Sequence, residues 1–365
     1  MKHDLKEISS HFNIYGDFII AVPYGTGHIN DTYQVAFNQA GTVVHYTIQR
    51  INHNVFKNPV KLMENIERVT SHIAAKSGDS RTTLSVVRTL DGQSCYVAPD
   101  GNFWRCYLFV ENARTYDVLE TASQAYEAAC AFGKFQSALV DIPGERLFET
   151  IVDFHNTPKR LANLEESIKL DKCGRVKNVA KEIDFVMSRR DDCGVLLDLH
   201  AQGLIPERIT HNDTKLNNVL IDDFTGTGIC VIDLDTVMPG LAHYDFGDMI
   251  RTGTSPALED EVDLSKVTMR FEMFEALLRG YLTGGNGFLN EVELEYLPFA
   301  GKLITMEIGI RFLTDYLDGD VYFKTHRNNH NLDRCHTQFK LVESIEQQLD
   351  AMKLKVNEVA AELKK

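Results

Sequence analysis

The chain has 365 residues, of which 44% are hydrophobic and 25% charged, and this globular composition leaves room for two structural units. Its formal net charge of −14 disfavours nucleic acids and anionic membranes as partners, because an acidic surface repels phosphate groups. No apolar run approaches the ~20 residues of a membrane-spanning helix, and we expect no signal peptide. The seven cysteines are scattered without C-x-x-C spacing, which disfavours disulfides and zinc sites and favours a cytoplasmic location.

Strand signals dominate the first ~110 residues. The apolar run Phe18–Pro23 precedes a glycine loop, Gly25-Thr26-Gly27. The stretches Thr32–Ala36 and Val43–Ile51 then flank turn residues at Asn38–Gly41. The sequence therefore predicts a meander of strands that begins beside a glycine loop.

A helix is predicted over Pro59–Ala75, because apolar residues recur on one helical face at Leu62, Ile66, Val69 and Ile73. Three further segments with strand patterns complete the predicted sheet: Leu84–Val87, Ser94–Ala98 and Trp104–Val110.

The pattern changes after residue 112, and from about residue 120 it is mainly helical, with one strand-like break at Val219–Asp235. We therefore expect a small lobe over residues 1–110 and a large lobe over residues 111–365. Apolar residues from Val342 to Leu363 alternate at spacings of three and four, which favours a terminal helix packed along the large lobe. A dimer seam is the alternative reading, so both a monomer and a dimer stay open.

The segment His211–Asn218 contains the pattern H-x-D-x-x-x-x-N. Phosphoryl transfer to a hydroxyl needs a carboxylate that orients the attacking oxygen and takes its proton, and it needs an oxygen ligand for Mg²⁺ close by. Asp213 suits the first role and the side-chain carbonyl of Asn218 suits the second. A polar turn before a strand is the plain structural alternative.

A second motif follows in Cys230–Asp235, where an apolar strand ends in two acids. Asp233 is the predicted Mg²⁺ ligand, because hard cations take oxygen ligands. Asp235 is either a second ligand or a loop cap. The triplet Asp245-Phe246-Gly247 spells D-F-G, but it lies too far past Asp213, so we expect Asp245 to brace the catalytic loop through hydrogen bonds.

At these residues the chain resembles the aminoglycoside phosphotransferase and choline kinase superfamily. Further segments resemble bacterial N-acetylhexosamine 1-kinases across nearly the whole chain: Gly27–Asn30, Thr210–Asn218, Ile232–Thr236, Leu258–Glu261, Arg311–Leu313, Asp315–Leu317 and Gly319–Phe323. The resemblance implies an α+β, protein-kinase-like fold with a β-rich small lobe that binds nucleotide and a mainly helical large lobe. It also implies ATP, Mg²⁺ and a sugar whose anomeric hydroxyl is phosphorylated.

Residue roles follow from the same resemblance. Asp213 would be the catalytic base, with Asn218 and Asp233 on Mg²⁺. The sugar or its new phosphate would contact the side chains of His28, Asp213, Arg311 and Tyr322. His28, Arg311 and Tyr322 each also have a purely structural interpretation. His28 could stiffen the glycine loop, Arg311 could pair with Asp315 four residues on, and Tyr322 could belong to the core.

The chain departs from the kinase pattern at the strand that normally carries a phosphate-binding Lys. Tyr46-Thr47-Ile48 leads to Gln49 and Arg50. We expect Gln49 to take the Lys position and point inward while Arg50 faces out. The partner acid is predicted to be Glu67, with Glu64 as the alternative.

Nucleotide contacts are also predicted from two backbone segments. The amides of Gly25, Thr26 and Gly27 could cradle phosphate, although this loop is shorter than G-x-G-x-x-G. The link between the lobes, Phe109-Val110-Glu111-Asn112, would hold adenine.

The main rival is a kinase of another small alcohol, such as an aminoglycoside, choline or homoserine. A choline site needs an aromatic cage, and the one Trp, Trp104, lies in the small lobe. An aminoglycoside site needs an acidic rim, for which Leu258–Asp263 is the candidate. A catalytically inactive binding module is the rival from a different class.

Overall fold

The computed structural model describes residues 3–25, 29–116 and 119–364. The chain divides into two compact units. The sheet unit comprises Met1–Arg114, Asp141–Val152 and Leu220–Pro239, and the helical unit comprises Thr115–Val140, Asp153–Val219 and Gly240–Lys365. The sheet unit thus includes two later segments that the sequence assigned to the large lobe.

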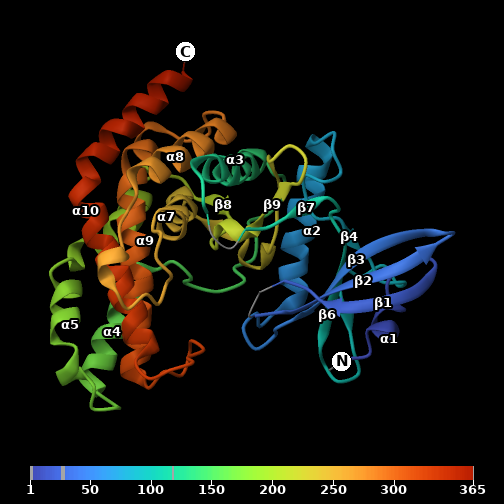
Figure 1. Cartoon of the computed structure of the whole chain (residues 1–365), viewed down its shortest axis with the longest axis horizontal. Coiled ribbons are helices and arrows are strands. Elements are labelled where there is room, and N and C mark those ends of the chain that lie inside the picture. Colours follow the sequence, from blue (N-terminus) through green and yellow to red (C-terminus); the bar gives the residue numbers. More distant parts are fainter. Residues whose placement is uncertain (1–2, 26–28, 117–118, 365) are drawn as a thin grey trace. The chain divides into compact units, whose positions relative to one another are not determined.

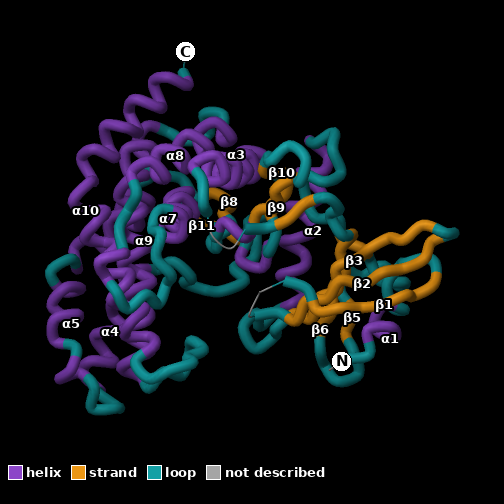
Figure 2. The backbone as a smooth tube through the Cα atoms, in the orientation of Figure 1, coloured by secondary structure: helices purple, strands orange, loops and turns teal. Residues whose placement is uncertain are grey.

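The main sheet of the sheet unit is antiparallel and has the order β1-β2-β3-β6-β4, with β5 also paired to β6 (Figures 1 and 2). Its strands are β1 (Asp17–Pro23), β2 (Asp31–Gln39), β3 (Thr42–Ile51), β4 (Val86–Val87), β5 (Tyr96–Val97) and β6 (Phe103–Leu108). Ala40 and Gly41 join β2 to β3, and both have positive φ, as a two-residue hairpin turn requires.

One face of this sheet packs with the short helix α1 (Leu5–Ser9) around Val35, Ile48 and Cys106. Strand β6 is buried on both faces, because Arg105 and Tyr107 are as inaccessible as Trp104 and Cys106. An arginine therefore lies inside this unit, on the face of the sheet opposite the apolar core.

Helix α2 (Pro59–Lys76) lies in the same unit and buries the predicted face, which confirms the helix expected there. Asn65 on this helix ties together the later segments of the unit. Its side chain donates to the carbonyl of Phe148 at 2.7 Å and to that of Val237 at 3.1 Å. The smaller sheet β10-β9-β7, of Gly228–Val231, Val219–Asp222 and Ala113–Arg114, completes the unit.

The helical unit contains helices α3 to α10, which Figure 1 colours from green to red along the chain. They are α3 (Ala122–Ala138), α4 (Thr157–Leu170), α5 (Ala180–Met187), α6 (Val195–Ala201), α7 (Ala242–Gly253), α8 (Phe271–Gly285), α9 (Glu291–Asp318) and α10 (His330–Leu363). The short strands β8 (Arg208–Thr210) and β11 (Met238–Gly240) flank the segments that carry the predicted chemistry. The prediction of an α+β fold with a strand-rich first part and a helical second part is confirmed.

Helices α3 and α8 approach closely because glycines face the partner backbone. A Cβ at Gly280 would lie 2.1 Å from the carbonyl oxygen of Tyr126, and one at Gly284 would lie 2.1 Å from that of Cys130. Larger residues at these positions would force the helices apart. This contact matters for the site, because α3 carries Gln136, whose side chain donates to the carboxylate of Asp245.

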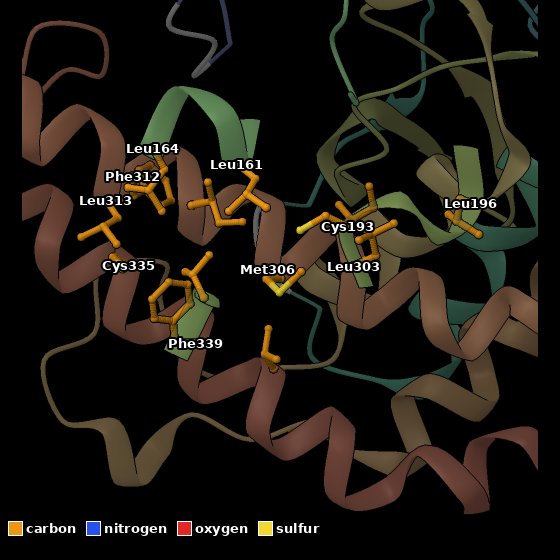
Figure 3. Packing of buried hydrophobic residues seen from close by; sticks show 14 of the residues in the cluster. Leu161, Leu164, Cys193, Leu196, Leu303, Met306, Phe312, Leu313, Cys335 and Phe339 are labelled. Carbon is orange, nitrogen blue, oxygen red and sulfur yellow. The ribbon is translucent and has the colours of Figure 1, made fainter. Parts of the chain in front are cut away.

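The core of the helical unit lies between α4, α9 and α10, as Figure 3 shows for Leu161, Met306 and Phe339. Val342, Ile345, Met352 and Val356 of α10 are fully buried, so the predicted terminal helix packs on its own chain. Among the described residues, no helix combines the length and hydropathy needed to span a bilayer.

Candidate active site

The segment His211–Asn218 connects β8 to β9 and presents the Asp213 carboxylate, which is 27% exposed. Lys215 Nζ lies 3.0 Å from Asp213 Oδ1. Burial alone would raise the pKa of Asp213, but Lys215, His211 and Arg251 together outweigh this effect, and the net shift is downward. Asp213 is therefore a carboxylate at neutral pH, which is the form that can accept a proton.

Asn218 closes this loop. Its Nδ2 donates to the backbone carbonyl of Asp213 at 2.9 Å. Because the nitrogen of the amide is turned toward the loop, its Oδ1 is the atom that can face a cation. Asp213 and Asn218 are thus brought together, as the spacing of the motif predicts.

Asp245 braces the loop from the first turn of α7. Its carboxylate accepts the backbone N–H groups of His211 at 2.9 Å and Asn212 at 2.7 Å. Thr214 Oγ1 donates to the Asp245 carbonyl at 2.6 Å, and Gln136 of α3 donates to the carboxylate. Asp245 is completely buried, and burial raises its pKa. The predicted bracing role is confirmed.

The second motif belongs to the sheet unit. Asp233 follows β10 and has a φ of +58°, a left-handed conformation that Asp adopts more readily than most residues. Asp235 is only 3% exposed at its side chain. One of its oxygens binds the Arg105 guanidinium and the other accepts Asn30 Nδ2 at 2.7 Å. Both oxygens of Asp235 are thus engaged by protein groups, which is the arrangement of a structural ion pair.

Gln49 occupies the face of β3 that points toward Asp235. Its Nε2 donates to Thr32 at 2.8 Å, and its Oε1 accepts Arg105 Nε at 2.9 Å. Gln49 and Arg105 are direct cross-strand partners, so the cation beside position 49 is Arg105 of β6. Arg50 points to the other face and pairs with Asp31 at 2.7 Å rather than facing solvent.

The two acids weighed as partners of position 49 have other partners. Glu67 pairs with Arg88 at 2.9 Å, and Glu64 pairs with Lys61 at 2.7 Å. The buried pair at this site is instead Arg105 with Asp235. Sequence reasoning missed Arg105, although a charged residue inside the apolar run Phe103–Leu108 was a usable signal.

The predicted link is placed beside the first strands. Phe109 donates its N–H to the His45 carbonyl at 3.1 Å, and its ring meets that of Tyr24 edge-on with centroids 5.3 Å apart. Val110 is partly exposed and Glu111 is exposed, with Glu111 Oε1 2.6 Å from His45 Nδ1. Gly25 has the positive φ of a tight turn, while Thr26, Gly27 and His28 lie outside the described residues.

The predicted acceptor residues lie in the helical unit. The Arg311 guanidinium sits 5.5 Å from the ring centroid of Phe154, 5.9 Å from that of Tyr322 and 5.6 Å from that of Phe323. Arg311 has no ion-pair or hydrogen-bond partner among the residues that the structure describes. The predicted alternative, an ion pair with Asp315, is therefore wrong.

Asp315 instead organises the loop that carries Tyr322. Its carboxylate accepts the consecutive backbone N–H groups of Val321, Tyr322 and Phe323 at 2.8–2.9 Å. It also accepts Asn331 Nδ2 at 2.8 Å. The Tyr322 side chain is 68% exposed, so the alternative that placed it in the core is also wrong. The loop thus keeps the Tyr322 ring out of the core and beside the Arg311 guanidinium.

A family model described as the phosphotransferase enzyme family, APH, matches residues 21–280, about seven tenths of the chain. The chain belongs to this family. The matched range includes the catalytic loop, both aspartate motifs and the bracing Asp245.

Solved structures of known kinases share the fold. A microcompartment-associated aminopropanol kinase is 15% identical, with a TM-score of 0.64 over 96% of this chain and 98% of that one. An aminoglycoside phosphotransferase from Alicyclobacillus acidocaldarius is 10% identical, with a TM-score of 0.66 over 97% and 96%. A choline kinase from Cryptosporidium parvum is 16% identical, with a TM-score of 0.52 over 97% and 94%. These likenesses show the kinase-like fold of the phosphotransferase family.

The two predicted magnesium ligands each offer an oxygen donor, Asn218 in the helical unit and Asp233 in the sheet unit. Asn218 Oδ1 and the Asp233 carboxylate are hard oxygen donors. Within the described ranges, no cluster of three or more His, Cys, Asp or Glu side chains could hold a metal. Mg²⁺ keeps several waters and binds through one or two protein ligands plus substrate phosphates, so each of these oxygens is of a suitable kind.

Proposed function

We propose that this phosphotransferase uses ATP and Mg²⁺ to phosphorylate the anomeric hydroxyl of N-acetylhexosamines, giving the sugar 1-phosphate. N-acetylglucosamine and N-acetylgalactosamine are the proposed acceptors. The observation that carries the proposal is an ionised Asp213, fixed on a loop whose backbone is held by Asp245 and whose end is closed by Asn218. That is the arrangement a hydroxyl-activating carboxylate needs.

In the proposed reaction, Asp213 orients the acceptor hydroxyl and receives its proton as the oxygen attacks the γ-phosphorus of ATP. The bond between that phosphorus and the β–γ bridging oxygen breaks, and ADP leaves with the electron pair. Asn218 and Asp233 would hold Mg²⁺, which supplies charge neutralisation for the phosphates. The proposed nucleotide contacts are Gly25, Thr26, Gly27, Gln49, Glu67 and the link Phe109–Glu111.

ATP as the donor has support from structural relatives. A spectinomycin phosphotransferase, 13% identical with a TM-score of 0.56, was solved with ADP and spectinomycin. An aminoglycoside phosphotransferase, 14% identical with a TM-score of 0.52, was solved with ADP. The same fold in this chain makes a purine nucleotide the natural donor to test.

A sugar acceptor is supported by the Arg311 and Tyr322 pair. Arg311 has no hydrogen-bond or ion-pair partner among the described residues, so its N–H groups can donate to the oxygens of a sugar or its new phosphate. An exposed tyrosine offers a ring face and a hydroxyl. His28 is the third proposed contact.

Other alcohols are less well supported. Trp104 is 1% exposed and packs in the core of the sheet unit, so it cannot line an aromatic cage for choline. The acidic stretch proposed as an aminoglycoside rim is largely neutralised by ion pairs within its own unit. Glu259 binds Arg251, Asp260 binds Arg327, and Glu261 binds Lys266.

The test is an ADP-release screen of the purified chain with Mg·ATP over N-acetylhexosamines, hexoses, choline, homoserine and aminoglycosides. We expect turnover with N-acetylhexosamines, and phosphorus NMR should then place the phosphate on the anomeric carbon. Turnover confined to another alcohol would replace the acceptor assignment, and no turnover with any alcohol would favour a binding module. Asp233→Ala should weaken Mg·ATP binding in calorimetry, and unchanged affinity would remove Asp233 from the magnesium site.

A further inference from the structure

A buried histidine outside every sequence motif touches the catalytic loop. His155 precedes α4, and its side chain is 3% exposed. Its Nε2 lies 3.0 Å from the backbone oxygen of Asn212, the residue before Asp213. Its Nδ1 lies 2.9 Å from Glu307 Oε1 of α9, a carboxylate with no exposed surface. Thr157 Oγ1 donates to the other oxygen of Glu307 at 2.5 Å.

These partners fix the protons on the imidazole. A backbone carbonyl can only accept, so Nε2 carries hydrogen. A carboxylate already bonded by a hydroxyl donor is best satisfied by a second donor, so Nδ1 carries hydrogen too. His155 is then an imidazolium paired with an ionised Glu307. Burial alone would lower the pKa of His155, but Glu307, the Asn212 carbonyl and Asp248 together outweigh this effect, and the net shift is upward.

The Asn212 backbone is held from two sides. Its N–H binds Asp245 at 2.7 Å and its carbonyl binds His155 at 3.0 Å. Its φ of +65° is uncommon for a residue other than glycine and persists only where the surroundings enforce it. The Asn212 carbonyl belongs to the peptide group that enters Asp213, so a rotation of that group would redirect the Asp213 side chain.

We propose that charged His155, held by Glu307, is a positioning residue that fixes the Asn212–Asp213 peptide and aims the Asp213 carboxylate at the acceptor hydroxyl. The inference rests on the proposed function, because it assigns to Asp213 the role of base. His155 acts through the backbone and touches no reacting atom. Misplacement of a catalytic group by about 1 Å can cost ~10²-fold in rate.

A pH dependence follows from the same geometry. When the imidazolium loses one proton, the remaining hydrogen stays on Nδ1, where it is donated to Glu307. Nε2 then has no hydrogen to donate to the Asn212 oxygen, so the hydrogen bond that holds this peptide group is lost. The charged groups that act on the ring from its surroundings are Glu307 on α9 and Asp248 on α7, and both favour the proton. Arg311 acts on Glu307 in turn, and the Tyr244 ring lies 5.0 Å from that of His155. We therefore expect kcat to fall on the alkaline side, above the ordinary pKa of histidine.

Three variants separate positioning from stability. His155→Phe should lower kcat by roughly 10- to 100-fold with a much smaller change in KM for either substrate. Glu307→Gln should retain more kcat than His155→Phe and lose the alkaline limb, because a neutral ring can accept from the Gln amide at Nδ1 while Nε2 still donates to Asn212. His336→Asn is the matched control, since His336 pairs with Glu182 at 2.7 Å away from the loop. It should change neither kcat nor its pH profile.

A second readout does not need turnover. In the wild-type chain, the amide resonance of Asp213 should titrate together with the His155 ring in nitrogen–proton NMR, and Glu307→Gln should abolish that joint titration. If no alcohol is phosphorylated, the proposed function fails while this measurement still decides the role of His155. An Asp213 amide that ignores the His155 titration would overturn the inference. So would a folded His155→Phe variant with wild-type kcat, or an alkaline limb unchanged in Glu307→Gln.

Discussion

Asp213 of the helical unit and Asp235 of the sheet unit each pair with a cation, but in different surroundings. The Asp213 side chain is 27% exposed and its partner Lys215 is 48% exposed. The side chains of Asp235 and Arg105 are 3% and 1% exposed, and Asn30 takes the second oxygen of Asp235. An accessible carboxylate with a flexible lysine partner can still receive a substrate proton, whereas a buried carboxylate with both oxygens engaged maintains structure.

The strongest test of this contrast removes the charge of Asp213. Asp213→Asn should lower kcat by at least ~10²-fold, because general base catalysis contributes 10²–10⁴-fold. The unfolding midpoint should hardly change, since the side chain lies on a partly exposed loop. Steady-state kinetics and thermal unfolding measure both quantities. Wild-type kcat in the folded variant would remove Asp213 from the role of base.

Arg105→Met tests the other half of the contrast, because it leaves Asp235 buried without its cation. Loss of one partner of a buried ion pair costs about 3–5 kcal/mol. We expect a loss of this order in the free energy of unfolding, measured by denaturant titration. Lys61→Met is the matched control, since Lys61 pairs with Glu64 on the exposed face of α2 and should cost ~0–1 kcal/mol.

A double variant can sharpen the point. Gln49 and Arg105 face each other across β3 and β6, so Gln49→Lys combined with Arg105→Gln moves the cation to the neighbouring strand. If Asp235 needs only a nearby cation, the double variant should recover part of the stability that Arg105→Gln alone loses. No recovery would mean that the planar guanidinium, which also binds Gln49, is itself required.

The two regions also differ in how far the sequence predicts them. The order of elements, helix α2 and the bracing role of Asp245 were predictable because periodicity and motif spacing are local. The cation beside Asp235 was not, because it depends on the register that puts Arg105 opposite Gln49. The partner of Asp315 was missed for a similar reason, since a carboxylate can bind backbone amides as well as an arginine one helical turn away. His155 has no motif at all, and only the packing of α9 against its segment reveals its contacts.

A buried histidine makes the stability of the helical unit depend on pH. His243 of α7 is completely buried, donates from Nε2 to the Glu293 carbonyl at 3.0 Å, and burial lowers its pKa to about 4. The folded state therefore favours the neutral ring. This preference for the neutral ring stabilises the folded state fully above pH ~6.5. The stabilisation declines as the pH falls toward 4, and the total loss is about 3 kcal/mol.

His243→Gln can keep the hydrogen bond to Glu293 but cannot titrate. As the pH falls from 7 to 4.5, the unfolding free energy of the wild type should therefore decrease relative to that of this variant. Denaturant titrations at several pH values measure it, and the subtraction removes the contribution of carboxylates common to both chains. A difference independent of pH would show that His243 does not titrate in this range.

The smallest expected effect concerns substrate choice. Arg311→Ala should raise KM for the acceptor by roughly tenfold, a loss of ~1.4 kcal/mol, while KM for ATP changes little. The reason is that Arg311 lies beside three aromatic rings and has no hydrogen-bond or ion-pair partner among the described residues, so its N–H groups can donate to an acceptor. Arg334→Ala is the matched control, because Arg334 also lies over an aromatic ring, Phe312, but donates to the Lys324 carbonyl at 3.1 Å. Equal changes in both KM values for Arg311→Ala would exclude a direct acceptor contact, and the same acceptor effect in Arg334→Ala would attribute it to general disturbance of the helical unit.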